Sequence, residues 1–221
     1  MAQVPSFAEL AASPDPTLDT LALALAAEFR DVDLAGAMWR LDLLGAELSY
    51  AAERTSAAPE ALALACGELL GGAHGFVGER EEYDHPDNSM LDIVLARRRG
   101  LPILLSVVYV EVARRAGIPL AGVGLPGHFV VGHFGADPPL LLDPFAGGAA
   151  LGAIILPSQV RPWTPHEIAM RMLNNLVVAY QRRSDVSAAI RAARLRLALP
   201  AEASMRDTLQ AELRAMQAQL N

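Results

Sequence analysis

Residues 101–116 limit most strongly what this chain can fold into. The run LPILLSVVYV, which starts at Leu101, is apolar on nearly every side of a helix, so the first half of that helix has to be buried all round. Proline stands at its start and Gly117-Ile118-Pro119 at its end, which is the order of residues that begins and stops a helix. We therefore expect a central helix over residues 102–116.

The pattern within this helix predicts which side chains are covered. Those expected to be almost fully buried are Ile103, Leu104, Val107, Val108 and Val110. Those expected to reach water are Glu111, Arg114 and Arg115. The rest of the chain then has to pack around the apolar half.

The segments on either side of the helix differ in hydrophobic periodicity. Apolar residues recur every three or four positions over residues 18–29, 34–50 and 59–70, which predicts helices, the third ended by Gly71-Gly72. Short apolar runs at 122–125, 129–134 and 140–143 predict an antiparallel sheet packed on the central helix. After a further apolar piece at 154–156, helices return from Thr164 onward. The order helix, sheet, helix predicts an α+β fold.

We expect three regions: a helical one over residues 1–75, a core over 76–162 and a second helical one over 163–221. The last resembles one tetratricopeptide hairpin in a pattern carried by Asn175, Leu176, Ala179, Tyr180, Asp185, Ala188, Ala189, Ile190, Ala193 and Pro200. One hairpin cannot bury its own faces. We therefore expect it to pack on the core, closed by one more helix that carries Leu209, Leu213 and Met216.

Composition disfavours several classes of partner. The net charge of -7 and the pI near 5.2 argue against nucleic acid and anionic membrane surfaces. The longest apolar stretches fall short of the roughly 20 residues that span a bilayer. The first residues lack the basic start and apolar run of a signal peptide, so we expect a cytoplasmic protein without a membrane segment. Nothing in the sequence indicates an oligomeric state.

The loop before the central helix ends in turn and cap formers, at residues 85–89. We expect Asn88 or Ser89 to cap a helix over residues 90–98, which Gly100 then stops.

Cysteine and histidine usage bounds the chemistry. Cys66 is the single cysteine, which excludes an internal disulfide and any multi-cysteine zinc site. It falls within an apolar helix, so we expect a buried, inert side chain. The five histidines show no paired ligand spacing, and His128 and His133 would face opposite sides of a regular strand. We expect no metal and no cofactor.

Two short motifs are the candidates for chemistry. Residues 125–129 (LPGHF) and 142–145 (LDPF) each place a titratable side chain at the end of a predicted strand. On neighbouring strands, His128 and Asp143 can meet as an imidazole and its orienting carboxylate, the pair that triad enzymes use. The alternatives are a buried hydrogen-bonded pair without a catalytic role and two unrelated polar residues.

The order and spacing of Gly100, the central helix, His128 and Asp143 resemble those of the transglutaminase-like superfamily over about residues 85–150. Three stretches are similar to its SirB-type bacterial branch: residues 88–102 (NSxLDxVLxRRxGxP), 126–129 (PGHF) and 143–148 (DPFxGG). That branch carries tetratricopeptide-like helices after the core, as the pattern near the C-terminus suggests here. The resemblance implies a papain-like core in which a buried helix packs on a small antiparallel sheet.

The resemblance also places a catalytic cysteine two residues after Gly100, at the start of the central helix, where the helix dipole lowers a thiol pKa. This sequence has Pro102 there, which supplies neither a nucleophile nor a backbone N–H for an oxyanion. Its neighbours Leu101 and Ile103 are no better. We expect His128 and Asp143 to line a residual cleft together with Asn88, Pro102 and Gly127.

Ser106 is the alternative nucleophile, because it lies one turn beyond Pro102 on the same helix face. A serine inside a helix usually donates instead to the carbonyl four residues back, which argues against this role.

Three functions remain open from the sequence. The first is a non-catalytic binding or regulatory module with a residual His128–Asp143 cleft, taking a protein or peptide partner. The second is a hydrolase or acyl-transfer enzyme on an amide bond, using Ser106 or water as nucleophile. The third is an interaction scaffold that works through the C-terminal helices.

Overall fold

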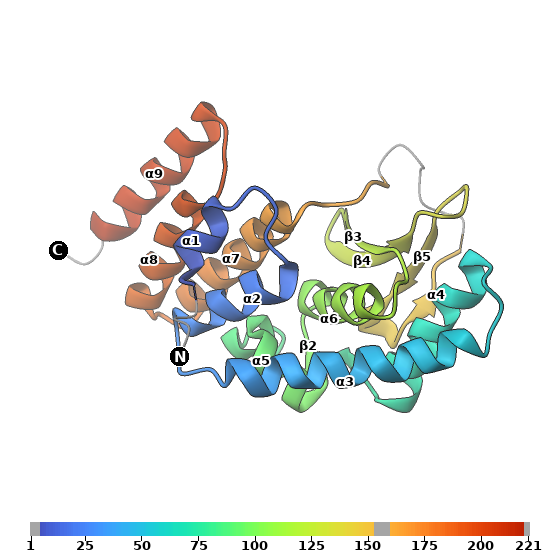
Figure 1. Cartoon of the computed structure of the whole chain (residues 1–221). Coiled ribbons are helices and arrows are strands. Elements are labelled where there is room, and N and C mark those ends of the chain that lie inside the picture. The colour runs from blue at the N-terminus through green and yellow to red at the C-terminus, as the bar shows by residue number, and fades with distance from the viewer. Residues whose placement is uncertain (1–4, 153–159, 219–221) are drawn as a thin grey trace.

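The helix that the sequence predicts to be central, α6 (Pro102–Arg115), is buried in the middle of the fold. A computed structural model describes residues 5–152 and 160–218. In it, α6 contacts helices on one side and a small sheet on the other, so the fold is α+β as predicted (Figure 1). The predicted apolar piece at 154–156 lies outside the described residues.

Most of the burial predicted for α6 is confirmed. Ile103, Leu104, Val107 and Val108 are no more than 1% exposed. Val110 is only partly buried, because the helix turns this position toward the edge of the core. Glu111, which we expected to reach water, is 1% exposed, so that prediction is wrong.

Four helices make up the described chain before residue 68, and the second and third of them pack against α6. They are α1 (Phe7–Ala12), α2 (Leu18–Ala27), α3 (Leu34–Glu53) and α4 (Pro59–Gly67), and α4 continues as a π-helix over Glu68–Ala73. The side chain of Asp33 accepts a hydrogen bond from the backbone of Gly36 and so caps α3. The three helices predicted in this region are confirmed. Gly71 does not end the third one, because the π-helix runs on to Ala73.

The loop that leads into α6 is more structured than its polar sequence indicates. A two-residue strand β1 (Val77–Gly78) pairs in parallel with β2 (Arg99–Gly100) and so brackets a 3-10 helix (Pro86–Ser89) and α5 (Leu91–Arg97). The capping prediction is wrong, because Met90 is the N-cap of α5 and its side chain makes no cap hydrogen bond. The helix also stops before Gly100, at Arg98, whose φ of 59° is left-handed.

The predicted antiparallel sheet packs on the other side of α6. Its strands run in the order β3 (Leu120–Leu125), β4 (His128–His133), β5 (Leu140–Asp143) and β6 (Ala149–Ala150). A 3-10 helix (Pro144–Ala146) follows β5 directly. β3 and β4 form the closest contact of the sheet with α6.

The C-terminal region adds α7 (Pro165–Arg182), α8 (Val186–Leu195), a 3-10 helix (Arg196–Ala198) and α9 (Ala203–Ala218). Helix α7 contacts α2 and α6, so the region packs on the core, and α9 stands against α8 at the far end (Figure 1). The predicted closing residues Leu209, Leu213 and Met216 are buried. Kinship with tetratricopeptide repeats and the three-region division stay predictions.

An ion network explains why Glu111 is buried. The guanidinium of Arg115 lies 2.6 Å from Asp19 Oδ2 and 2.8 Å from Glu111 Oε2, and both carboxylates are almost fully buried. Burial and the Asp19 charge raise the pKa of Glu111. Burial alone would raise the pKa of Asp19, but hydrogen bonds from Thr17 and Arg115 outweigh this effect and lower the pKa. The network joins α2 to the end of α6.

No helix among the described residues is both long enough and apolar enough to cross a bilayer.

Replacing Val108 with aspartate should lower the free energy of unfolding by about 3 kcal/mol or more, because a charge would be buried without a partner. Urea denaturation measures the loss. The control is Leu43→Asp at a position that is 46% exposed on α3, where the effect should stay within about 0.5 kcal/mol. Equal stability of the two variants would contradict the central placement of α6.

Replacing Arg115 with methionine should lower the free energy of unfolding by about 3 kcal/mol at neutral pH, since buried Asp19 would lose its nearest cation and the two carboxylates would share only Arg114, which is 50% exposed. The loss should shrink as the pH falls. In the folded parent Arg115 helps to lower the pKa of Asp19, so acid that protonates Asp19 costs the parent more stability than it costs the variant, which lacks this contact.

Arg161→Met is the matched control for this prediction. It removes an exposed arginine that pairs with Glu167 on the surface, and it should change stability by about 1 kcal/mol or less. A loss from Arg115→Met no larger than that of the control would show that the network does not hold α2 on α6.

Candidate functional site

The turn between β3 and β4 sets the position of His128. Pro126 and Gly127 connect the two strands, and Gly127 has a φ of +70°, a conformation that favours glycine. A Cβ at Gly127 would meet nothing within 4 Å, so the backbone angle alone calls for glycine there. The role of Gly127 is therefore to turn the hairpin at the first residue of β4.

Strand register brings His128 and Asp143 to one face of the sheet. Val131 pairs with Leu142, so Asp143 falls opposite Val130, and His128 lies two residues further along on the same face. His128 Nε2 is 3.0 Å from Asp143 Oδ2. The predicted contact on adjacent strands is confirmed.

The carboxylate of Asp143 has two partners. Its Oδ1 accepts a hydrogen bond from the backbone N–H of Phe145 at 2.9 Å, while Oδ2 faces the imidazole. The 3.0 Å approach of Nε2 to Oδ2 predicts the tautomer of His128 that carries its proton on Nε2. Nδ1 is then the nitrogen that can act as a base toward a ligand. The imidazole is 31% exposed and the carboxylate 14%.

Aromatic and basic side chains that we did not predict surround the pair. The ring of Phe145 lies edge-on to His128, with centroids 6.2 Å apart, and contacts Tyr83 in the same way at 6.1 Å. Arg80 lies over Phe145, and Arg171 of α7 donates to the carbonyl oxygen of His128 at 3.1 Å. Phe145 could have been found from its place in the 142–145 motif. No local signal points to Arg171, since it lies 43 residues from His128.

Close backbone contact holds the loop after Asp143. A Cβ built on Gly71 would lie 1.8 Å from the carbonyl oxygen of Gly147, and one on Gly67 would lie 2.7 Å from that of Gly148. Gly147 and Gly148 themselves have positive φ angles. The helix that precedes the core therefore uses glycine to approach the loop that carries Asp143.

The predicted cleft residue Asn88 lies in the 3-10 helix before α5, next to the start of α6, where the predicted cleft residue Pro102 stands. Pro102 is the first residue of α6 and is buried. The backbone N–H of Leu101 donates to the carbonyl oxygen of Asn88 at 3.1 Å. The side-chain amide of Asn88 donates to the carbonyl oxygens of Glu82 and Tyr83. Asn88 thus organises the loop rather than facing a ligand.

Both alternative nucleophiles are buried. Ser106 Oγ donates to the carbonyl oxygen of Pro102 at 2.9 Å, and the residue is 0% exposed. Cys66 Sγ donates to the carbonyl oxygen of Leu62, and burial raises the pKa of this thiol to about 12. The expectation that Cys66 is buried is confirmed. A substrate could reach neither side chain without opening the core.

A small cavity of about 200 Å³ adjoins the start of α6. Tyr83, Ser89 and Leu101 line it from the core, and α7 forms its other wall. The hydroxyl of Ser89 is buried and has no hydrogen-bond partner within the described residues. An ion pair between Asp84 and Arg182 lies at this cavity and links the loop to α7.

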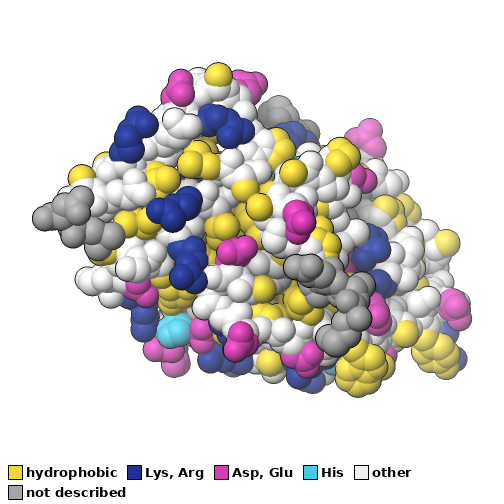
Figure 2. All heavy atoms as spheres, turned by 60° about the vertical axis from the view of Figure 1, so that its left-hand side comes forward, with side chains coloured by type: hydrophobic (Ala, Val, Ile, Leu, Met, Phe, Trp, Pro, Cys, Tyr) yellow, Lys and Arg dark blue, Asp and Glu magenta, His cyan; other side chains and the backbone are white. Residues whose placement is uncertain are grey.

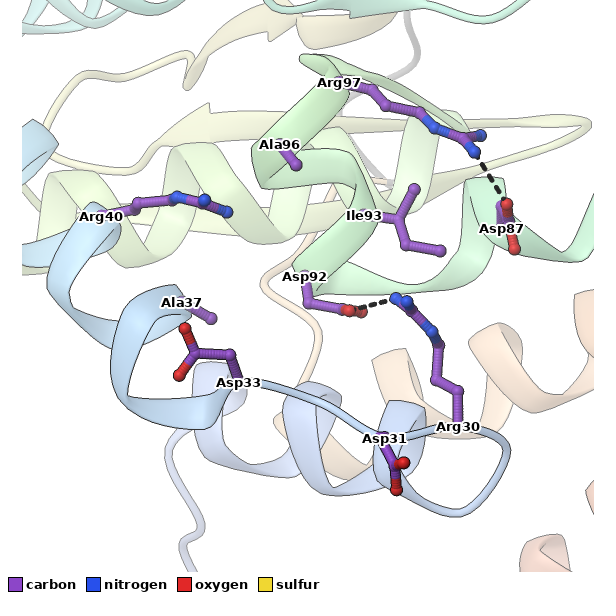
Figure 3. A pocket seen from close by; sticks show the side chains of 10 residues that line it. All are labelled: Arg30, Asp31, Asp33, Ala37, Arg40, Asp87, Asp92, Ile93, Ala96 and Arg97. Carbon is purple, nitrogen blue, oxygen red and sulfur yellow. Dashed lines mark hydrogen bonds and ion pairs between the residues drawn. The ribbon is translucent and has the colours of Figure 1, made fainter.

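Another cavity, of about 520 Å³, is lined by arginines and aspartates of α3, α5 and the loop before α3 (Figure 3). Arg30 pairs with Asp92, and Arg97 pairs with Asp87 at 3.0 Å. Because these charges largely neutralise one another, the cavity offers no strong preference for one sign of ligand charge. Within residues 5–152 and 160–218, no group of three or more His, Cys, Asp or Glu side chains could hold a metal ion.

Comparison with known proteins identifies a family. The model of the transglutaminase-like superfamily matches residues 35–156, and so includes α3 and α4 as well as the sheet. No solved structure matches the chain significantly.

Three relatives illustrate the similarity. A UPF0162 protein of Xylella fastidiosa (strain 9a5c) is 49% identical over 94 residues, which are 42% of this chain and 34% of that protein. A UPF0162 protein of Vibrio cholerae is 35% identical over 74 residues, 33% of this chain and 27% of that protein. F-box only protein 21 of Mus musculus is 43% identical over 56 residues, 25% of this chain and 9% of that protein. The matched segments span about a third or less of each relative.

Replacing Asp143 with alanine should remove the preference of His128 for one neutral tautomer. In the parent protein, nitrogen NMR of the imidazole should show the proton on Nε2, because this nitrogen lies 3.0 Å from Asp143 Oδ2 and a proton there would face the carboxylate. In the variant, the two neutral tautomers should both be populated. A parent imidazole that carries its proton on Nδ1 would show that the carboxylate does not orient the ring.

Proposed function

Because the chain belongs to the transglutaminase-like superfamily, we propose that it is a member without thiol chemistry that works as a binding or regulatory module. The surface around His128 and Asp143 takes a protein or peptide segment. The observation that carries this proposal is Pro102, which occupies the first position of α6.

Pro102 removes two functions at one position. By resemblance to the superfamily, the nucleophilic cysteine stands at the start of the central helix, where backbone N–H groups also stabilise an oxyanion. Proline has neither a thiol nor an N–H. Cys66 cannot replace the lost thiol, because it is buried and its pKa is raised to about 12.

What surrounds the pair suits a protein or peptide ligand. Tyr83 is 44% exposed, and it packs with Arg80 on Phe145, whose ring lies beside the imidazole of His128. Aromatic and arginine side chains are the ones enriched at protein interfaces. An imidazole with a free Nδ1 adds a polar group that can bond a peptide N–H or carbonyl.

The relatives support a module rather than a complete enzyme. The segment shared with F-box only protein 21 makes up 9% of that protein, so similar residues occur inside a much longer chain. The proposal therefore concerns the transglutaminase-like part, residues 35–156. A role of the whole chain in binding or regulation is likewise proposed, since the matched segments span about a third or less of each relative.

A hydrolase with water as nucleophile is the second candidate. The observation that favours it is the 3.0 Å contact of His128 with Asp143, because a histidine oriented by a carboxylate can act as a general base. Ser106 is a poor nucleophile for such an enzyme, since its hydroxyl is buried and donates to Pro102. Peptide or ester hydrolysis that His128→Ala abolishes and Ser106→Ala leaves intact would establish this candidate.

Replacing Pro102 with cysteine tests the main proposal. The new thiol should have a pKa well below the ordinary value of about 8.5, because the helix dipole and the imidazolium of His128 favour the thiolate. The rate of alkylation against pH measures this pKa. Adding His128→Ala should raise it again.

Two controls complete this test. The variants carry Cys66→Ala so that one thiol is titrated, and a second protein carries the cysteine at Leu64, which is 46% exposed on α4, as an unperturbed reference. The proposal would be contradicted if the Pro102→Cys thiol had the same pKa as the reference and His128→Ala did not change it. That result would mean that His128 and Asp143 do not act on a group at position 102.

A further inference from the structure

A cavity of about 670 Å³ opens between α7 and the start of α9. Its volume lies within the range of roughly 300 to 1,000 Å³ in which proteins bind small ligands. Trp163, Met170 and Arg171 line one part of it, and Pro200 and Met205 line another. Figure 2 brings forward the end of the molecule that carries the C-terminal helices, where hydrophobic and arginine side chains are mixed on the surface.

The guanidinium of Arg171 is a half-buried positive charge in this cavity. Its guanidinium lies over the rings of Phe129 and Trp163, 5.5 and 5.7 Å from their centroids, and donates to the carbonyl oxygen of His128. It has no carboxylate partner among the described residues. Burial lowers its pKa, as expected for a guanidinium that is half-buried without a counter-charge.

The other arginines nearby are compensated. Arg161, at the same cavity, pairs with Glu167, and Arg196 pairs with Glu212 at 2.9 Å. Glu202 also lines the cavity, but it is exposed and solvated. A buried charge without a partner is unfavourable, and a guanidinium retains several N–H donors when one is used. The arrangement therefore calls for an anion from outside the chain.

Two polar groups beside Arg171 can complete an anion site. The side-chain oxygen of Asn174 accepts a hydrogen bond from Arg196 Nη1 at 3.1 Å, which turns the NH₂ group of Asn174 into an available donor. The Nε2 atom of His166 is buried and has no hydrogen-bond partner within the described residues. Buried polar atoms in proteins usually have partners, so an unpaired one in a cavity wall points to a ligand.

The remaining wall is apolar. Trp163 presents its ring, which lies so close to β3 that a Cβ on Gly124 would fall 2.1 Å from it. Met170 and Met205 provide flexible side chains, and Met205 is 51% exposed. Methionine adapts its shape to different apolar ligands. The cavity thus joins one cationic group to an adaptable apolar surface.

We infer that this cavity binds an amphipathic carboxylate, with the carboxylate on Arg171 and Asn174 and the apolar part against Trp163, Met170 and Met205. The site is separate from the surface proposed around His128 and Asp143, and it does not depend on that proposal. The two are neighbours, because Arg171 also bonds the backbone of His128. The carboxylate comes either from a small organic acid or from an acidic residue of a peptide.

The test uses the fluorescence of Trp163 in a Trp39→Phe background, which leaves a single tryptophan in the cavity wall. The probes are 4-phenylbutyrate with its neutral amide, and the peptide acetyl-Leu-Glu-Leu-amide with its glutamine counterpart. In at least one pair, the acid should bind about tenfold or more tightly than its neutral form, because it makes charge-assisted hydrogen bonds. The pair with the larger preference identifies the source of the carboxylate.

Variants then locate the site. Arg171→Gln should abolish the preference for the acid, Arg171→Lys should retain part of it, and Arg182→Gln, which alters a paired arginine at the other end of α7 and outside the cavity, should leave it unchanged. Thermal unfolding and circular dichroism of each unliganded variant confirm that it is folded. Equal binding of acid and neutral form in both pairs, or a preference that survives Arg171→Gln, would overturn the inference.

Discussion

The burial of α6 is the constraint on which the rest of this structure depends. A helix that is apolar on nearly every side has no face to leave in water, so helices, sheet and C-terminal region must all contact it. The sheet covers one side, and α2, α3, α5 and α7 cover others. Charges enter only at its end, where Arg115 joins Asp19 and Glu111 in a network that fixes α2 against it. That network orients α2, while apolar burial supplies most of the stability.

The same burial explains why chemistry is so restricted along α6. Ser106 satisfies its hydroxyl on the helix backbone, and Cys66 packs nearby as a small apolar side chain. Pro102 suits the first turn of a helix, because the N–H it lacks would have no partner within the helix. Each of these positions is well explained by stability. His128 and Asp143 lie where β4 begins and β5 ends. Stability gives no comparable reason for the arrangement of this polar pair.

One side chain connects the C-terminal helices to the ends of β4 and β5 that carry His128 and Asp143. Arg171 of α7 lies over the rings of Phe129 and Trp163 and donates to the carbonyl oxygen of His128. A ligand that engaged the guanidinium would act on a residue already bonded to the hairpin that carries the imidazole. The superfamily core and the helices after it are thus physically joined at the place where both present polar groups.

The sequence by itself determined the central helix, the three main strands and the contact between His128 and Asp143, because these depend on local periodicity, turn residues and strand alternation. It did not determine that Glu111 is buried, that Asn88 organises a loop instead of capping a helix, or that Arg171 reaches His128. The first and the last depend on partners distant in the chain: Asp19 is 96 residues from Arg115, and Arg171 is 43 residues from His128. Asn88 bonds instead to carbonyl groups within its own loop, whose path periodicity does not predict. Only packing in three dimensions decides which charge finds a partner and which stays uncompensated, and at Arg171 it left one available to a ligand.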